Sequence, residues 1–176
     1  ISSRGPLFFC DTDINAYPTA EEIADITLLA AEEVSRFVPP KVALLSHSSF
    51  GSHKSRQARK MAEALQLIRQ RAPHLEVDGE MRGDAALSEE LRRRVFLHSP
   101  LKGAANLLIM PNAEAANISH NLLQEVTHSV SVGPITLGLA KPAHILTRSA
   151  SARRIINMTA IAAVDAQEYL LSQQSG

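Results

Sequence analysis

The chain has a single cysteine, Cys10, and no tryptophan among its 176 residues. One cysteine excludes an internal disulfide and any zinc or iron–sulfur site built from several cysteines, and it is typical of a reducing compartment. With 5 Phe and 2 Tyr, the chain also has too few aromatic rings for a platform on which nucleic-acid bases stack. The core is therefore expected to be aliphatic.

A surplus of charge is missing as well. The 18 Lys and Arg balance 18 Asp and Glu, so the formal net charge is 0 and the pI is near 7.2. Such a chain is not expected to gather nucleic acid or an anionic membrane, although a local basic patch stays open. No apolar run approaches the roughly 18 residues of a membrane helix, and no leader peptide is recognisable. We expect a soluble, cytoplasmic protein with no nucleic-acid or membrane partner.

What the chain does contain is an alternation of short apolar runs and longer amphipathic segments. The apolar runs, which predict buried strands, are 7–10, 42–45, 75–77, 106–110 and 135–139. Helical periodicity is found in 20–37, from 55 to before Pro73, in 88–95, in a stripe through Ile118, Leu122, Leu123 and Val126, and from 151 to 169. Continuous apolar strands are buried on both faces, and the helices between them supply the cover. The expected fold is α/β, with an open, mainly parallel sheet and helices on both faces in three layers.

Local signals mark the ends of these helices. Thr19 and Glu22 have the spacing of a capping box, and Pro39-Pro40 would end the first helix after Phe37. Ser151 would cap the last helix.

Ligands of such sheets bind beyond the carboxyl ends of the strands, which directs attention to 11–17, 46–54, 78–84, 111–117 and 146–151. Residues 46–55 follow a strand and open a helix, and they offer hydroxyls, backbone N–H groups and a positive helix end, which suit phosphate or another anion. The spacing is neither that of a Walker A loop nor that of a dinucleotide-binding motif. A solvated loop with ordinary helix capping is the alternative.

Two arginines, Arg153 and Arg154, stand in the first turn of the last predicted helix, where acidic residues are favoured. Each costs about 0.3–1 kcal/mol against the helix dipole when it is exposed. A bound anion would offset this cost. Alternatively, the two arginines pair with carboxylates of a neighbouring loop or subunit.

Other candidate sites are weaker. Asp78, Glu80 and Asp84 offer three carboxylates for a hard cation or for acid–base chemistry, but Arg82 lies among them and favours ion pairing. His47 and His53 lack the spacing of a helical metal pair, so no metal site is expected. Cys10 has no local partner and is interpreted as a buried strand cysteine.

A collinear series of short motifs resembles the C-terminal part of the phosphate acetyltransferase (phosphate acetyl/butaryl transferase) family. These motifs are FCD at 9–11, PTAE at 18–21, VALLS at 42–46, DGE at 78–80, DAA at 84–86, NLLIMP at 106–111, GPI at 133–135 and GLAKP at 138–142. Further details, LLSHS at 44–48, MPN at 110–112 and ARRIINM at 152–158, are similar to the transacetylase-like C-terminal domain of large bacterial NADP-dependent malic enzymes.

The resemblance implies that residues 7–171 form the second subdomain of the phosphate acetyltransferase fold, with tails at 1–6 and 172–176. It implies a fragment of a longer chain, because the family's site lies in a cleft between two subdomains. The first subdomain would carry a further phosphate-binding arginine.

The resemblance also implies roles for residues. Arg148 matches the transacetylase arginine that meets the phosphate or coenzyme A, and Thr147 replaces its usual serine. Transacetylases usually have an acidic pair where this chain has Arg153 and Arg154, and one of those acids is thought to assist the chemistry. The implied site binds acetyl-CoA or acetyl phosphate and has no catalytic and no metal residue. Its ligand-binding set is Ser46, Ser48, Ser49, Asn112, Lys141, Thr147, Arg148, Arg153 and Arg154.

Three functions are compatible with this resemblance. The first is a non-catalytic, acetyl-CoA-binding regulatory domain of an NADP-dependent malic enzyme, whose NADP and divalent metal would bind elsewhere in the parent chain and not in this segment. The second is a fragment of an active phosphate acetyltransferase, which joins acetyl phosphate and coenzyme A. The third is an oligomerisation module, in which the apolar face of the last helix forms a homodimer. This function is compatible with either of the other two.

Overall fold

The computed structural model describes residues 5–148 and 150–174. The chain divides into two compact units, Ile1–His128 and Ser129–Gly176. The first unit holds the sheet, and the second holds one helix and a long irregular segment. In the described residues, no helix has the length and apolar character needed to cross a membrane.

The first unit is built on a four-stranded sheet in the order β1-β4-β2-β3, with every neighbouring pair parallel. The strands are β1 (Phe8–Cys10), β2 (Lys41–Leu45), β3 (Glu76–Met81) and β4 (Leu107–Ile109). After β2 the chain crosses toward β3, whereas after β4 it continues into α5 (Ala113–Thr127), which packs on β1. The loops that leave these two neighbouring strands therefore diverge, and such a point is where ligands bind in open α/β sheets.

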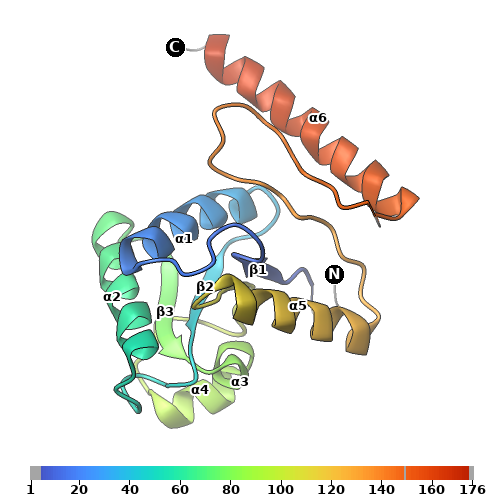
Figure 1. Cartoon of the computed structure of the whole chain (residues 1–176). Coiled ribbons are helices and arrows are strands. Elements are labelled where there is room, and N and C mark those ends of the chain that lie inside the picture. Colours follow the sequence, from blue (N-terminus) through green and yellow to red (C-terminus); the bar gives the residue numbers. More distant parts are fainter. Residues whose placement is uncertain (1–4, 149, 175–176) are drawn as a thin grey trace. The chain divides into compact units, whose positions relative to one another are not determined.

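Helices cover both faces of this sheet, as Figure 1 shows. On one face α1 (Ala20–Ser35) and α2 (Arg56–Arg71) pack against each other and against the strands. On the other face lie α3 (Gly83–Leu87) and α5, and α4 (Glu89–Val95) packs against α3. The predicted three-layer α/β fold with a parallel sheet is confirmed.

The core is aliphatic, as the scarcity of aromatic rings predicts. Between the sheet, α3 and α5 it consists of Ala43, Leu45, Met81, Ala85, Ala86, Leu101, Ala105, Leu108, Met110 and Ala116. Because side chains alternate along a strand, Val42 and Leu44 face the opposite layer, where both are fully buried.

Most predicted elements are confirmed to within a few residues. The capping box of α1 is present, since the Glu22 N–H donates to Thr19 Oγ1 at 3.2 Å and the Thr19 N–H donates to Glu22 Oε2 at 2.7 Å. However, α1 ends at Ser35. Phe37, expected in its apolar stripe, therefore lies past the helix and is half-exposed.

Two predictions are wrong. Residues 78–84, predicted as a loop, continue β3 as far as Met81 and then begin α3. Residues 135–139, predicted as a strand, have no strand pairing in the described structure. There the Thr136 N–H donates to His144 Nδ1 at 3.2 Å, and Gly138 has a φ of +76°, outside the strand region.

The apolar stripes of the last two helices have the predicted spacing, but several of their residues are exposed in the described chain. Ile118, Leu122, Leu123 and Val126 of α5 are all exposed, Val126 at 76%. On α6 (Ala152–Gln174), Ile155 and Ile156 are exposed as well. In both helices the helical period is right, but the stripe on α5 is left exposed, and on α6 Met158 is buried while Ile155 and Ile156 are not.

Candidate functional site

In the loop after β2, the backbone N–H groups donate hydrogen bonds within the protein. From Ser48 to His53 every N–H donates within the protein, to the Ser46, Ser48 and Ser52 hydroxyls, to the Ser49 carbonyl, or to Glu80. Such groups are not available to surround a phosphate. Ser55 Oγ accepts from the Ala58 N–H at 3.1 Å, so the loop ends in an ordinary helix cap, which was the alternative interpretation of its sequence.

Two of the predicted ligand-binding serines are buried in this loop. Ser48 is 0% exposed, and its hydroxyl donates to Glu80 Oε1 at 2.7 Å. Ser49 Oγ accepts from the Arg82 N–H at 3.3 Å, and Ser46 Oγ accepts from the Ser48 N–H at 3.2 Å. The hydroxyls thus have structural partners, and their contact with a ligand stays a prediction.

Glu80 reaches this loop because β3 contains a bulge. Leu44 pairs with Gly79 and Leu45 pairs with Met81, so Glu80 is the additional residue. Bulges re-aim side chains near functional sites, and Glu80 Oε1 accepts from both Ser48 Oγ and the Gly51 N–H, the latter at 2.8 Å. Sequence reasoning missed this organising role, since nothing local connects Glu80 with a loop 29–32 residues away.

The three carboxylates around Gly79 do not converge on one point. Asp78, 1% exposed, accepts from Arg69 Nη2 at 2.9 Å and from Ser99 Oγ at 2.5 Å. Asp84 pairs with Arg82 on the surface at 3.3 Å. Structural pairing is therefore found for Asp78 and Asp84, but Glu80 forms no ion pair in the described residues. In the part of the chain that the structure describes, no three His, Cys, Asp or Glu residues are placed to hold a metal.

The end of β4 is joined to its neighbours by Lys60 of α2. Its Nζ donates to the Pro111 carbonyl at 2.7 Å and to the Pro18 carbonyl at 2.9 Å. Burial lowers the pKa of Lys60 from its ordinary 10.5, and Arg56 adds to this while Glu22 opposes it. Sequence reasoning did not single out Lys60, because both partners are distant in sequence. Asn112, which was predicted, caps α5 through Oδ1, which accepts from the Ala115 N–H at 2.8 Å.

Cys10 lies at the end of β1 as predicted, but it is partly rather than fully buried. Burial, with a smaller contribution from the Asp11 charge, raises the pKa of its thiol to about 12. A thiol with this pKa holds almost no thiolate at neutral pH, which argues against a nucleophilic role.

The second unit carries the predicted basic residues. Lys141, Thr147, Arg148 and Arg153 are exposed, and Arg154 is half-buried. Ser151 caps α6, since its Oγ accepts from the Arg154 N–H at 3.3 Å. The Arg154 side chain turns back, and its Nε donates to the Gly133 carbonyl at 2.6 Å. Within the described residues neither Arg153 nor Arg154 is in ion-pair distance of a carboxylate, so the alternative of carboxylate pairing is not what this unit shows.

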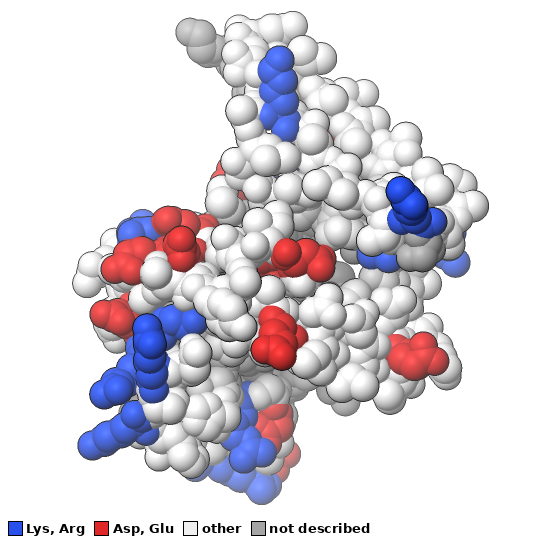
Figure 2. Space-filling view, viewed as in Figure 1, with Lys and Arg blue, Asp and Glu red and all other residues white. Residues whose placement is uncertain are grey.

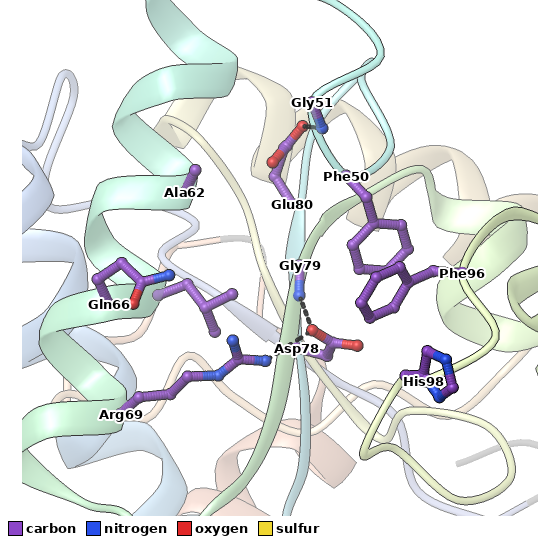
Figure 3. A pocket seen from close by; sticks show the side chains of 11 residues that line it. Phe50, Gly51, Ala62, Gln66, Arg69, Asp78, Gly79, Glu80, Phe96 and His98 are labelled. Atoms are coloured by element: carbon purple, nitrogen blue, oxygen red, sulfur yellow. Dashed lines mark hydrogen bonds and ion pairs between the residues drawn. The ribbon is translucent and has the colours of Figure 1, made fainter.

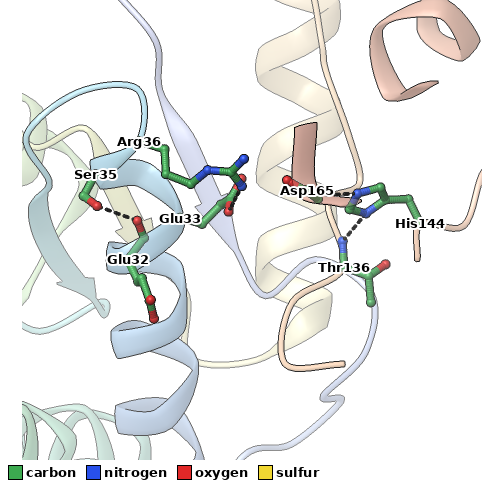
Figure 4. A network of polar contacts seen from close by, with 7 residues as sticks. All are labelled: Glu32, Glu33, Ser35, Arg36, Thr136, His144 and Asp165. Atoms are coloured by element: carbon green, nitrogen blue, oxygen red, sulfur yellow. Dashed lines mark hydrogen bonds and ion pairs between the residues drawn. The ribbon is translucent and has the colours of Figure 1, made fainter. Parts of the chain in front are cut away.

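A histidine that sequence reasoning passed over orders the segment before Arg148 (Figure 4). His144 Nε2 lies 2.9 Å from Asp165 Oδ2 of α6, and His144 Nδ1 accepts from the Thr136 N–H. Because Nδ1 accepts, the ring proton belongs on Nε2, where it is donated to Asp165. Together with Arg154 and Gly133, this contact fastens the irregular segment to α6.

Charges of both signs are mixed on the surface. On the face in Figure 2, basic side chains gather over α2 and α4 beside acidic ones, and much of the surface between them is uncharged. The net charge of 0 thus arises from acidic and basic side chains that lie near one another on the surface. Local groups of basic residues, such as those of the second unit, remain.

Residues 1–163 match the family model described as phosphate acetyl/butaryl transferase. The chain belongs to this family. The solved structure of a phosphotransacetylase from Streptococcus pyogenes matches 91% of this chain with a TM-score of 0.86 and 37% identity. The chain covers 49% of that protein.

Similarity to curated proteins extends over most of this chain. The NADP-dependent malic enzyme of Haemophilus influenzae is 56% identical over 165 residues, which are 93% of this chain and 22% of that enzyme. The phosphate acetyltransferase of Paracoccus denitrificans is 43% identical over 163 residues, 92% of this chain and 51% of that enzyme. The chain is thus homologous to the phosphate acetyltransferase-like domain of malic enzymes, and it spans about a fifth of their length.

Proposed function

We propose that this chain is a regulatory, acetyl-CoA-binding domain of an NADP-dependent malic enzyme and has no turnover of its own. The observation that carries the proposal is the group of exposed cations in the second unit, Lys141, Arg148 and Arg153, which have no ion pair with a described carboxylate. The higher identity to malic enzymes than to the phosphate acetyltransferase of Paracoccus denitrificans supports the same choice.

The chemistry of these residues suits phosphate groups rather than catalysis. Arginine presents a planar fork of donors that matches phosphate oxygens, and each charge-assisted hydrogen bond contributes about 1.5–3 kcal/mol. An anion held near Arg153 also offsets the cost of a cation in the first turn of α6. Arg154 cannot accept a proton at neutral pH, so it supplies no general base where transacetylases usually carry an acid.

Regulation requires differential binding. Acetyl-CoA inhibits malate oxidation only if it binds the inhibited form of the enzyme more tightly than the active form. The NADP and divalent metal of that reaction would bind in the remainder of the enzyme, since the described residues here contain neither a dinucleotide motif nor a metal-binding group. On this proposal the protein works in the cytoplasm.

The test is inhibition by acetyl-CoA of a full-length malic enzyme that contains this domain. The double variant Arg148→Ala, Arg154→Ala is expected to raise the inhibitory concentration of acetyl-CoA at least about tenfold, because phosphate hydrogen bonds are lost. Arg59→Ala, which removes an exposed arginine from α2, serves as the matched control and should leave inhibition unchanged. Unchanged inhibition in the double variant would refute the assignment.

An active phosphate acetyltransferase is the second candidate, favoured by the likeness to the Streptococcus pyogenes and Paracoccus denitrificans proteins. In that reaction the thiolate of coenzyme A attacks the acetyl carbon of acetyl phosphate and phosphate leaves, with Arg148 stabilising the phosphoryl oxygens. An assay of the full-length protein with acetyl phosphate and coenzyme A separates the two functions. We expect no turnover, and robust acetyl-CoA formation would favour the transferase.

A further inference from the structure

A pocket of about 380 Å³ lies beside β3, the edge strand of the sheet (Figure 3). Gln66 and Arg69 of α2 stand on one wall, and the rings of Phe50 and Phe96 form the other. The backbone of Gly79 lies between the two walls. We call this pocket the β3 slot. It belongs to the first unit alone, and none of the basic residues of the second unit lines it.

The unusual group in the β3 slot is the carboxylate of Glu80. Its side chain is buried, with the residue 3% exposed, yet both of its hydrogen bonds go to Oε1, from Ser48 Oγ at 2.7 Å and from the Gly51 N–H at 2.8 Å. Within the described residues nothing donates to Oε2. Figure 3 shows this second oxygen directed away from Gly51, toward the wall formed by α2.

The charges that line the slot do not balance. Arg69 pairs with Asp78 at 2.9 Å, so the guanidinium on the wall already serves one carboxylate. No basic side chain in the described chain forms an ion pair with Glu80. Because Oε2 has no donor within the described protein, a ligand that brings a hydrogen-bond donor or a positive charge to it gains a charge-assisted hydrogen bond.

The opposite wall is flat and apolar. The Phe50 and Phe96 rings are stacked, with centroids 4.5 Å apart and planes at 22°. Phe50 holds this position with a φ of +50°, a left-handed conformation that bulky residues rarely adopt, and such strained residues cluster at ligand sites. A planar or apolar group fits against this surface.

We propose that the β3 slot binds a small ligand that carries an amino group beside a flat or apolar body. The amino group donates to Glu80 Oε2, and the body lies against the Phe50–Phe96 pair. Two kinds of metabolite share this chemistry, a free amino acid with an apolar side chain and a nucleotide whose base has an exocyclic amine. The site is independent of the acetyl-CoA proposal, because it uses no residue of the second unit.

The test uses the whole 176-residue chain labelled with ¹⁵N and titrated with L-phenylalanine and, separately, with AMP. Binding is followed by NMR at the amides of Gly51 and Gly79, which both line the slot. N-acetyl-L-phenylalanine and IMP are the matched ligands, since each keeps the body and lacks the amino group. We expect at least one probe to shift these amides and its matched ligand to leave them unshifted.

Three variants connect this binding to the slot. In Glu80→Gln the amide oxygen must replace Oε1 to accept from Ser48 and Gly51, which turns the NH₂ donor toward the ligand, so affinity should fall at least tenfold. Ala62→Met narrows the slot from α2 without changing any charge and should also abolish binding. Glu63→Gln removes an acid from the exposed face of the same helix and should bind like the original chain.

Each outcome decides the proposal. Shifts with L-phenylalanine alone identify an amino-acid site, and shifts with AMP alone identify a nucleotide site. The proposal is overturned if neither probe moves these amides, if the matched ligands bind equally well, or if a folded Glu80→Gln keeps its affinity. Should Glu80→Gln fail to fold, Ala62→Met and the matched ligands still give the answer.

Discussion

Arg92 is the largest fully buried side chain of the described residues and the clearest case of a charge used for structure. Its Nη1 donates to the Ala85 carbonyl at 2.9 Å, and its Nη2 donates to the carbonyls of Leu101 at 2.9 Å and Gly103 at 2.7 Å. No described carboxylate forms an ion pair with it. The fork of donors on one guanidinium thus joins α3 to the segment that leads into β4, which a single ammonium group cannot do.

Arg92→Lys is therefore expected to destabilise the chain by about 2–4 kcal/mol, because several buried carbonyls lose their donors. Urea unfolding followed by circular dichroism measures this loss. The control is Arg93→Lys on the same helix. That arginine is exposed, and its contact with Glu89 is long at 3.8 Å, so the free energy of unfolding should change by no more than about 0.5 kcal/mol. Equal stability of the two variants would show that Arg92 has no such role.

At the scale of elements, the bulge in β3 decides how the loop after β2 is held. Gly79 makes the bulge possible, since a Cβ at this position would lie 2.8 Å from the Leu44 carbonyl oxygen and 2.9 Å from Leu44 Cβ. Both neighbours are part of the buried strand β2 and cannot rotate away. The glycine therefore lets β3 approach β2 closely while Glu80 turns toward the loop.

Gly79→Ala should cost about 3 kcal/mol, because the added methyl group forces two strands apart and the φ of +152° is strained for alanine. The melting temperature of the purified chain, read by calorimetry, should drop by several degrees. Gly83→Ala is the matched substitution: at that position in α3 a Cβ meets nothing within 4 Å, so a gain of up to about 1 kcal/mol is expected. A Gly79→Ala chain as stable as the original would contradict the close approach.

The same strand shows how far the sequence alone can lead. Continuous apolar runs correctly predicted β1, β2 and β4, because helices cover both faces of the sheet, although β1 at its edge is only partly buried. The extent of β3 was not predictable, since Asp78 and Glu80 are tolerated in a buried strand only through Arg69, Ser99 and Ser48, which lie 9 to 32 residues away.

The candidate site, too, could be predicted from the sequence only in part. Arg153 and Arg154 could be singled out from sequence, because arginine in the first turn of a helix opposes the dipole. Their surroundings could not be, since the bond from Arg154 to the Gly133 carbonyl and the bond from His144 to Asp165 each join residues 21 apart in the chain. The serines of the loop after β2 had suitable chemistry, but their hydroxyls are used by Glu80, by the Arg82 N–H and by the backbone of the loop itself.

At the scale of the whole molecule, net charge conceals what each unit presents. The formal charge of 0 leaves no long-range field, so attraction of an anionic ligand depends on local cations such as Arg148 and Arg153. Recognition of this kind weakens as salt is added, because the groups are exposed. Exposed apolar side chains are the other feature of the surface, and α6 carries several of them, namely Ile155, Ile156, Val164, Leu170 and Leu171.

One side of α6 is suited to pairing with a second copy of the chain. Met158 and Asp165 lie on its inner side, whereas Ile156 and Leu170 point outward and are exposed at 68% and 60%. Apolar faces of this length mark interaction surfaces, and a symmetric pair buries the same face twice.

Light scattering should therefore give twice the chain mass of 19.1 kDa. Ile156→Glu with Leu170→Glu should return the monomer mass, because a dimer would bury unpaired carboxylates. Gln70→Glu, which adds a charge to exposed α2, should leave the dimer intact, and a dimer that survives the double variant would place the interface elsewhere.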